Sequence, residues 1–181
     1  MPEPILRKSA KKTTYLTITA INEAVFLVID KKFLQFIKQF KVSEFQTWDL
    51  NVQYSDEILK DYCLFHLSSP SQERIIDFSK SDFEIIKYKT KETEKRKYLS
   101  YKDYKDDWNR EIYKGNTLIF NKLFLNFSSI NFDIVRLILM PVKGNGYFVS
   151  ERFKQAIEEQ GFTGMAFKEI EQIDSRIKVI Y

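Results

Sequence analysis

The stretch GYFVSERFKQAIEEQGFTGMAFKEI (146–170) constrains the fold more than any other part of the chain, because it carries both a start and a stop signal for one helix. Ser150 is a good N-cap, since its hydroxyl accepts a hydrogen bond from an otherwise unpaired amide of the first turn. Gly161 suits the left-handed residue that ends many helices, and Ile157 and Phe162 then form the apolar contact of a Schellman stop. We therefore expect one capped helix between Ser150 and Gly161.

Strand patterns surround this capped helix near 150–160. A short strand precedes it, and after Gly164 the segment MAFKEI (165–170) places Met165 and Phe167 on one face, as in a strand. The chain is thus expected to be an α+β protein with a mostly antiparallel sheet, a few helices and C-terminal strands. Upstream, the composition predicts one or two strands in 13–30, a helix in 31–40, a strand in 61–69, two strands or a strand and a helical turn in 74–89, and two strands in 117–140.

Length and composition predict a globular protein. The chain has 181 residues, 44% of them hydrophobic, which is enough for one domain with a sizeable core. We expect a flexible basic arm at 1–12, followed by a single α+β domain over 13–181. The first residues carry cations but no apolar run, so they do not read as a secretory signal. Cys63 is the single cysteine, which favours a reducing compartment, so we expect a cytoplasmic protein with no membrane partner.

A charged insertion at about 87–116 differs from the rest of the chain. It holds ten Lys or Arg and six Asp or Glu, with aromatic residues recurring at helical spacing. Three interpretations stay open: a helix that packs its rings on the core, a protein-binding surface, or a nucleic-acid surface on which bases stack on the rings. If the segment binds a partner, the expected contact residues are Tyr98, Tyr101, Tyr104, Trp108 and Arg110.

Residues that could carry chemistry are few. Cys63 and His66 lie on opposite faces if their segment is a strand, and zinc needs about four ligands, so both are expected to be structural. The acidic residues of the insertion alternate with Lys and Arg, which favours a solvated charged face over a cation site. We therefore expect no enzyme, no cofactor and no metal site. The acidic residues concerned are Asp103, Asp106, Asp107 and Glu111.

Three segments, in order, resemble an immunity-protein family of bacterial polymorphic toxin systems. FVSERFKQAIEEQGFTGMAFKEI (148–170) is similar to the C-terminus of that family, in which a Ser-Glu-Arg helix start leads to a Gly-x-x-Gly and a final strand. IIDFSKSDF (75–83) is similar to its Ile-Asp-x-x-x-Ser segment, and FDIVRLI (132–138) to its Asp-Ile strand before the last helix. The resemblance implies a protein that binds and neutralises a cognate toxin domain without catalysis, and it assigns no functional residue.

Two hypotheses of function follow. The first is an immunity protein whose partner is a toxin domain. The second is a nucleic-acid-associated module that uses the Lys- and Tyr-rich segment 87–114. The net charge of +4 permits contact with nucleic acid without demanding it.

Overall fold

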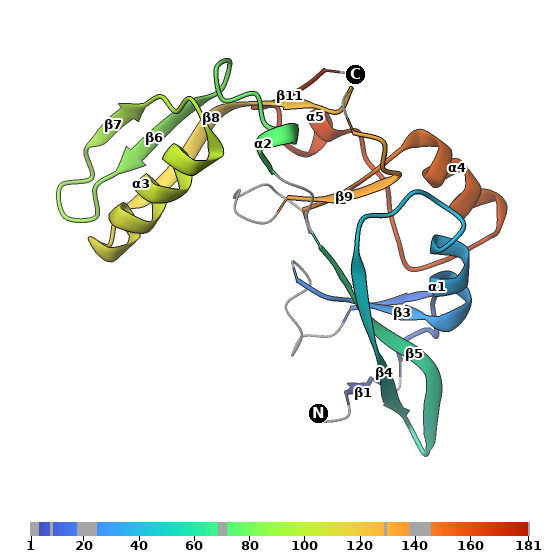
Figure 1. Ribbon diagram of the computed structural model, residues 1–181. Coiled ribbons are helices and arrows are strands. Elements are labelled where there is room, and N and C mark those ends of the chain that lie inside the picture. Colours follow the sequence, from blue (N-terminus) through green and yellow to red (C-terminus); the bar gives the residue numbers. More distant parts are fainter. Residues whose placement is uncertain are drawn as a thin grey trace. The chain divides into compact units, whose positions relative to one another are not determined.

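The computed structural model describes residues 4–7, 9–17, 25–68, 72–128, 130–137 and 146–180 (Figure 1). It confirms a mixed α and β fold with mostly antiparallel sheets, helices and a C-terminal strand. The chain divides into two compact units, and each is described by itself. Unit 1 consists of Met1–Pro70, Phe132–Ile138 and Asn145–Phe167, and unit 2 of Ser71–Asn131, Leu139–Gly144 and Lys168–Tyr181.

A five-stranded sheet in the order β1-β4-β5-β3-β2 forms the centre of unit 1. Its longest strands are joined by a tight turn in which Ser55 has a φ of 53°. All neighbouring strands are antiparallel except β1, which runs parallel to β4. The strands are β1 (Ile5–Leu6), β2 (Tyr15–Leu16), β3 (Leu27–Asp30), β4 (Phe45–Tyr54) and β5 (Glu57–Leu67).

Strand β1 lies in the segment that the sequence predicted to be a flexible arm. Ile5 pairs with Gln53 of β4, and the side chain of Leu6 is buried among apolar residues of the sheet. The physical reason is that Ile5 and Leu6 are apolar neighbours within a charged segment. The edge of β4 offers them backbone hydrogen-bond partners, as in the bond from the Gln53 amide to the Pro4 carbonyl, 2.9 Å.

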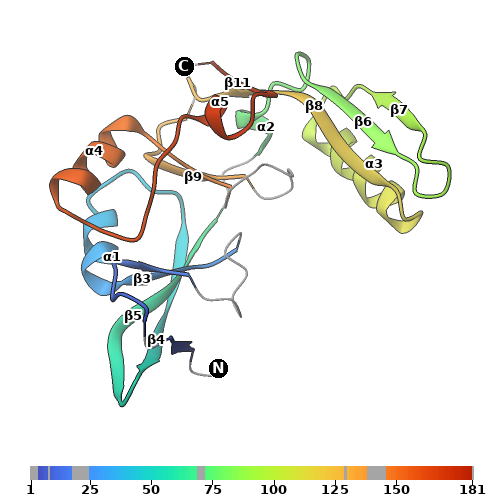
Figure 2. The ribbon, with the colours of Figure 1, turned by 180° about the vertical axis from the view of Figure 1, so that it is seen from behind.

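Both faces of this sheet carry apolar clusters. On one face, Cys63 and Phe65 pack against helices α1 (Lys31–Ile37) and α4 (Glu151–Glu159), which lie on the same side of the sheet (Figures 1 and 2). Helix α1 lies within the segment 31–40 that the sequence predicted to be helical. Asp30 caps it, because its carboxylate accepts a hydrogen bond from the Phe33 amide at 2.6 Å. The other face is covered by a second cluster: Leu6, Leu16, Val28, Leu50, Val52, Leu59, Tyr62 and Leu64.

Helix α4 starts and stops as the sequence predicts. The Ser150 hydroxyl accepts from the Phe153 amide at 3.2 Å. At the other end Gly161 has a φ of +68°, and the Phe162 amide donates to the Ile157 carbonyl at 3.2 Å, which is the long bond of a Schellman motif. Strand β10 (Tyr147–Val149) precedes the helix and pairs antiparallel with β9 (Ile134–Arg136).

The strand predicted over 165–170 is wrong. These residues have no strand pairing in the structure, and the last of them opens the short helix α5 (Ile170–Ile173). Met165 and Phe167 are nevertheless half-buried against the cluster that α1 and α4 cover. An alternating apolar pattern reports which side chains face a core, and here the core is reached without a neighbouring strand.

Gly164 sets the path of this segment, and its replacement is a direct test. Its φ is +93°, and a Cβ atom there would lie 2.4 Å from the Tyr15 carbonyl oxygen. We expect Gly164→Ala to lower the free energy of unfolding by about 2–3 kcal/mol, through backbone strain and a clash with main-chain atoms. Gly161→Ala is the matched control, because its φ is also positive but no atom lies within 4 Å, and it should cost about 1 kcal/mol. Urea unfolding of both variants measures the difference, and equal losses would contradict the proposed close approach.

Unit 2 is built on a four-stranded sheet in the order β11-β8-β6-β7, with β11 parallel to β8 and the other pairs antiparallel. Helix α3 covers one face, on which Phe83 and Ile85 of β6 lie opposite Phe120 and Leu118 of β8. Of the two interpretations of 74–89, the strand with a helical turn is confirmed. The elements are α2 (Gln72–Ile75), β6 (Asp82–Ile86), β7 (Thr93–Arg96), α3 (Tyr101–Tyr113), β8 (Thr117–Asn126) and β11 (Ile177–Ile180).

Candidate partner-binding surface

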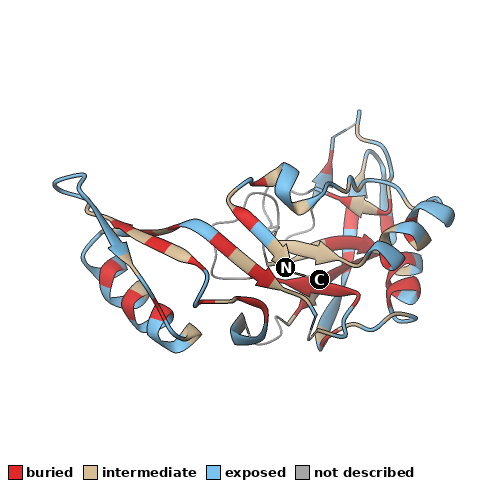
Figure 3. Ribbon diagram, turned by 90° about the horizontal axis from the view of Figure 1, so that it is seen from above, coloured by how far each residue is buried: buried red, intermediate tan, exposed pale blue. Residues whose placement is uncertain are grey.

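Helix α3 holds four of the five residues that the sequence singled out as partner contacts, and Tyr98 precedes its N-cap. The Ser100 hydroxyl caps its first turn by accepting from the Asp103 amide at 3.1 Å. The helix ends before Gly115, whose φ of +76° takes the left-handed region. Between these ends one stripe of the helix is buried and another is exposed (Figure 3). The predicted residues therefore differ in what they touch.

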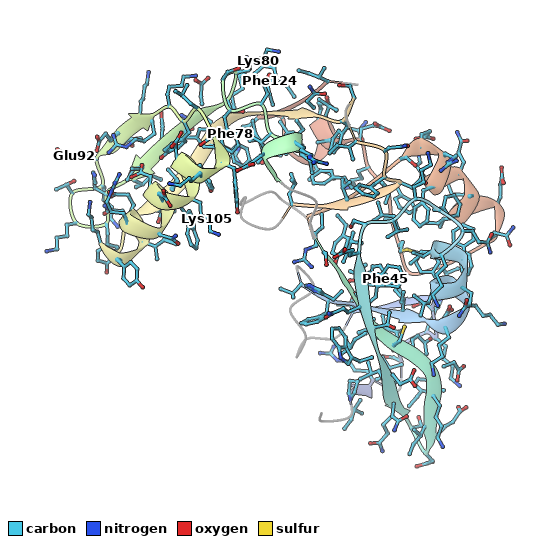
Figure 4. All side chains as sticks on the ribbon, viewed as in Figure 1. Phe45, Phe78, Lys80, Glu92, Lys105 and Phe124 are labelled. Carbon is cyan, nitrogen blue, oxygen red and sulfur yellow. The ribbon has the colours of Figure 1, made fainter. Side chains whose placement is uncertain are left out.

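Tyr98 and Tyr104 belong to the core of unit 2. Tyr104 is 1% exposed, and its ring centroid lies 5.5 Å from that of Tyr98 and 5.4 Å from that of Phe83. Phe78 completes the cluster at 6.1 Å from Tyr104 (Figure 4). Burial raises the pKa of both tyrosines, and the Tyr98 hydroxyl donates to the Asp107 carboxylate at 2.7 Å. For these two positions the packing supports the core interpretation.

The acidic residues of α3 fall into two groups. Asp107 and Glu111 are buried and paired, whereas Asp103 and Asp106 lie on the exposed side. Asp107 accepts from Tyr98 and Arg110 and lies 3.3 Å from the Arg96 guanidinium. Within the described residues no group of three or more His, Cys, Asp or Glu is placed to hold a metal ion.

Glu111 joins the end of α3 to the neighbouring turns. Its carboxylate accepts from the Lys114 ammonium at 2.7 Å and from the Asn116 amide at 2.6 Å, and the Lys87 ammonium lies at 3.6 Å. These contacts, with that of Lys114 foremost, lower the pKa of Glu111 from 4.5 to about 2. The carboxylate is thus held in its charged form.

This pKa shift makes the stability of unit 2 depend on pH. A carboxylate whose pKa is lower in the folded state contributes stability that is present above about pH 4.5 and is lost as the pH falls towards 2. In Glu111→Gln the free energy of unfolding should be lower at neutral pH. Its slope against pH across this range should also be smaller, by an amount that corresponds to at most about one bound proton. Urea unfolding at several pH values, followed by Trp108 fluorescence in a Trp48→Phe background, measures both effects. Identical pH profiles for variant and parent would refute the role assigned to Glu111.

One flank of α3 presents a stripe of large side chains at positions i, i+4, i+7 and i+11. At 100° per residue this spacing places them within a narrow arc of the helix surface. Tyr101 and Trp108 are half-buried, and Ile112 is 45% exposed. Lys105 is exposed on the same flank (Figure 4). We call this stripe the α3 ridge: Tyr101, Lys105, Trp108 and Ile112.

Arg110 lies on the opposite flank of the helix. Its guanidinium donates to Asp107 and lies 3.7 Å from Glu111, while its side chain remains 62% exposed. The five predicted contact residues therefore do not form one surface. Two are core, two belong to the α3 ridge, and Arg110 faces away from it. Ile112 was missed by the sequence reasoning, although its spacing from Tyr101 and Trp108 was visible there.

Cys63 and His66 are separated by the sheet of unit 1, as their spacing predicts. Cys63 is 1% exposed in the cluster beneath α1 and α4, and burial raises the pKa of its thiol to about 11. His66 instead lies beside the ring of Phe26, with Nδ1 3.1 Å from the Val25 carbonyl. The two side chains make no joint site.

Comparisons with known proteins add no relative: no family model, no curated protein and no solved structure matches this chain. Among the helices of the described residues, none combines the length and the apolar character that crossing a membrane requires. The α3 ridge is the candidate surface, because its large side chains, two half-buried and two exposed, form one row on a helix whose neighbouring face is packed against the sheet.

Proposed function

We propose that this protein is an immunity protein that binds a cognate toxin domain in the cytoplasm and neutralises it by direct contact through the α3 ridge. It acts without catalysis of its own, since occupying the toxin is sufficient. The observation that carries the proposal is the row of Tyr101, Trp108 and Ile112 on one flank of a packed helix, in which the first two side chains are half-buried and Ile112 is exposed. Tyr and Trp are enriched among the residues that dominate protein–protein binding energy.

The buried face of α3, beside the ridge, explains how such a ridge would serve as a binding surface. Tyr104 is buried in an aromatic cluster, and Asp107 and Glu111 are held by several cations each. The helix is therefore fixed along one face. A surface that is already ordered loses little conformational freedom when a partner binds, which favours affinity.

Two of the segments that carry the family resemblance meet in unit 1. Asp133, from FDIVRLI, accepts from the Ser150 hydroxyl at 2.7 Å and from the Arg152 Nε at 3.2 Å, and these residues begin the Ser-Glu-Arg helix. The Lys41 amide also donates to Asp133, at 2.9 Å. The resembling positions thus contact one another, which supports treating them as one structural motif.

The third segment orders its own turn in unit 2. The Asp77 carboxylate accepts from the Ser79 hydroxyl at 2.6 Å and from the Lys80 amide at 3.2 Å. The Ser81 hydroxyl donates to the Asp77 carbonyl and accepts from the Phe124 amide at 3.0 Å, which fastens the turn to β8. All three segments act as scaffold, so the contact surface is sought elsewhere, on the α3 ridge.

Co-expression tests the proposal. The C-terminal domain of the protein encoded next to this chain is expressed alone and together with it, and growth and complex formation are measured. We expect the domain to stop growth, the wild-type chain to restore it, and the two to elute as one complex. Ile112→Glu should weaken binding by about tenfold or more, because it places a charge in the contact without touching the core. Trp48→Ala is the matched control, a 41% exposed aromatic residue of unit 1.

Two results would overturn the proposal. One is a domain that stops growth equally well in the presence of the wild-type chain. The other is full protection by folded Ile112→Glu and Trp108→Ala variants, which would remove the α3 ridge from the contact. Circular dichroism of each variant establishes that it is folded before its binding is interpreted.

A further inference from the structure

The turn between β6 and β7 meets the end of α3 at Glu111. The Tyr88 amide donates to the Asn116 side chain at 3.0 Å, and Asn116 in turn donates to Glu111 at 2.6 Å. The Lys87 ammonium approaches the same carboxylate at 3.6 Å. Two segments that are distant in the chain therefore share one end of unit 2. We call its exposed residues the α3 tip: Tyr88, Lys89, Lys91, Tyr113 and Lys114.

The backbone of the α3 tip is well defined. In the β6–β7 turn the Lys87 amide donates to the Glu92 carbonyl and the Lys91 amide to the Lys87 carbonyl, each at 2.9 Å. Lys91 adopts a left-handed φ of 61°, which tightens the turn. After α3, the Gly115 amide donates to the Ile112 carbonyl at 2.8 Å. The side chains of the tip thus extend from two hydrogen-bonded turns.

Two tyrosines on these turns are unusually accessible. Tyr113 is 92% exposed and Tyr88 is 65% exposed, and Ile112 at 45% links them to the α3 ridge. Aromatic side chains gathered on an ordered surface indicate an interaction site more often than single exposed apolar residues do. The α3 tip and the α3 ridge are neighbours in the sequence, since Ile112 of the ridge directly precedes Tyr113 of the tip.

The α3 tip carries three lysines, Lys89, Lys91 and Lys114, and the exposed carboxylate of Glu92 lies in the same turn, so positive charge is in excess. The carboxylates of Glu94, Asp107 and Glu111 are each paired with cations of the same unit. Within the described residues, however, no ion pair involves four exposed lysines of the segment. Their charge is available to an anionic partner. These lysines are Lys89, Lys91, Lys95 and Lys105.

The geometry of Tyr88 favours carboxylates over nucleobases as that partner. The Lys91 ammonium lies 4.8 Å from the centroid of the Tyr88 ring. The Cβ atom of Tyr88 lies close to Gly115, where an added Cβ would be 3.8 Å away from it. Single-stranded nucleic acid binds by stacking successive bases on open rings, and here the Lys91 ammonium already lies over one face of the Tyr88 ring. Lysine ammonium and tyrosine hydroxyl groups donate hydrogen bonds readily to carboxylates.

We propose that the α3 tip docks onto an acidic face of the partner, with carboxylates of the toxin domain held by Lys89, Lys91 and the Tyr113 hydroxyl beside the α3 ridge. The inference rests on the proposed function and adds the chemistry of the toxin surface. Because these charges lie at the rim of the contact, they steer the encounter and raise the association rate more than they slow dissociation.

The test measures association and dissociation of the purified toxin domain at about 0.05 M and about 0.5 M salt, where screening is weak and strong. Lys89→Glu combined with Lys91→Glu should slow association by about tenfold at low salt, with a smaller effect at high salt. Tyr113→Ala should weaken binding by about tenfold through lost contact. Lys32→Glu combined with Lys60→Glu is the control, because it makes the same charge change at exposed positions of unit 1.

The outcomes separate this inference from the proposed function. Normal binding of the toxin domain by the tip variants, with no salt dependence, overturns the inference and leaves the proposed function standing. A wild-type chain that does not bind the domain overturns both. A labelled single-stranded RNA of about 16 nucleotides is the second probe. Salt-sensitive binding of this RNA that Tyr113→Ala abolishes, without binding of the domain, would assign the tip to nucleic acid instead.

Discussion

Replacing Tyr104 by alanine is expected to lower the free energy of unfolding by about 3–5 kcal/mol, because it removes a fully buried ring and leaves a cavity. The ring is 1% exposed and contacts Phe83, Tyr98 and Phe78 within one aromatic cluster. Each unit contains one of the two tryptophans, so Trp108 reports on unit 2 in a Trp48→Phe background. Urea unfolding followed by Trp108 fluorescence measures the loss.

Tyr113→Ala is the matched control for Tyr104→Ala. It removes the same side chain from the same helix at a position that is 92% exposed, so the free energy of unfolding should change by less than about 0.5 kcal/mol. A stable Tyr104→Ala protein that loses toxin binding would reverse the assignment, placing Tyr104 in the contact surface. A destabilised Tyr104→Ala protein would confirm that Tyr104 is a core residue.

Asp133→Ala is expected to have a comparable effect in unit 1, lowering the free energy of unfolding by about 3–4 kcal/mol. The substitution leaves the Lys41 amide and the Ser150 hydroxyl without their acceptor and detaches Arg152 from the strand. Burial acts to raise the pKa of Asp133, but hydrogen bonds from Arg152, Ser150 and Lys41 outweigh it and hold the pKa below its usual value. The stability from this carboxylate is therefore present at neutral pH and is lost as the pH falls below the ordinary aspartate range.

Arg152→Ala provides the comparison for Asp133. The arginine side chain is 64% exposed. Removing it breaks the same ion pair but leaves the buried hydrogen bonds of Asp133 in place, so the free energy of unfolding should fall by about 1 kcal/mol or less. Trp48 fluorescence in a Trp108→Phe background follows unit 1 during urea unfolding of both variants. Equal losses would mean that the ion pair, and not the hydrogen bonds from Lys41 and Ser150, carries the stability.

Local signals account for what the sequence predicted well. Helix α4 was predicted with both of its ends, because Ser150, Gly161 and Phe162 act on backbone groups within a few residues of themselves. The segment 165–170 shows the limit of such reasoning. Its alternation correctly marked Met165 and Phe167 as facing a core, but a strand also needs a neighbour, and that depends on distant parts of the chain.

The same limit applies to the candidate surface. Tyr101, Tyr104 and Trp108 share helical spacing, yet the first and last are half-buried and the second is enclosed. Spacing assigns side chains to an arc of the helix, and only the position of the sheet beneath α3 divides that arc into core and surface. The acids show the same effect, since Asp107 and Glu111 were expected on a solvated face and are instead buried and paired with cations of neighbouring segments.

The way the chain passes back and forth between the two units has a consequence for its synthesis. Unit 1 needs α4, and the sheet of unit 2 needs β11, which pairs with β8 from much earlier in the chain. A domain made of one continuous segment folds as that segment leaves the ribosome. Here neither unit is complete until residues beyond 146 have emerged, so the earlier strands of each unit wait for elements that are made later. The sheet beneath α3 is therefore complete only after β11 has been synthesised.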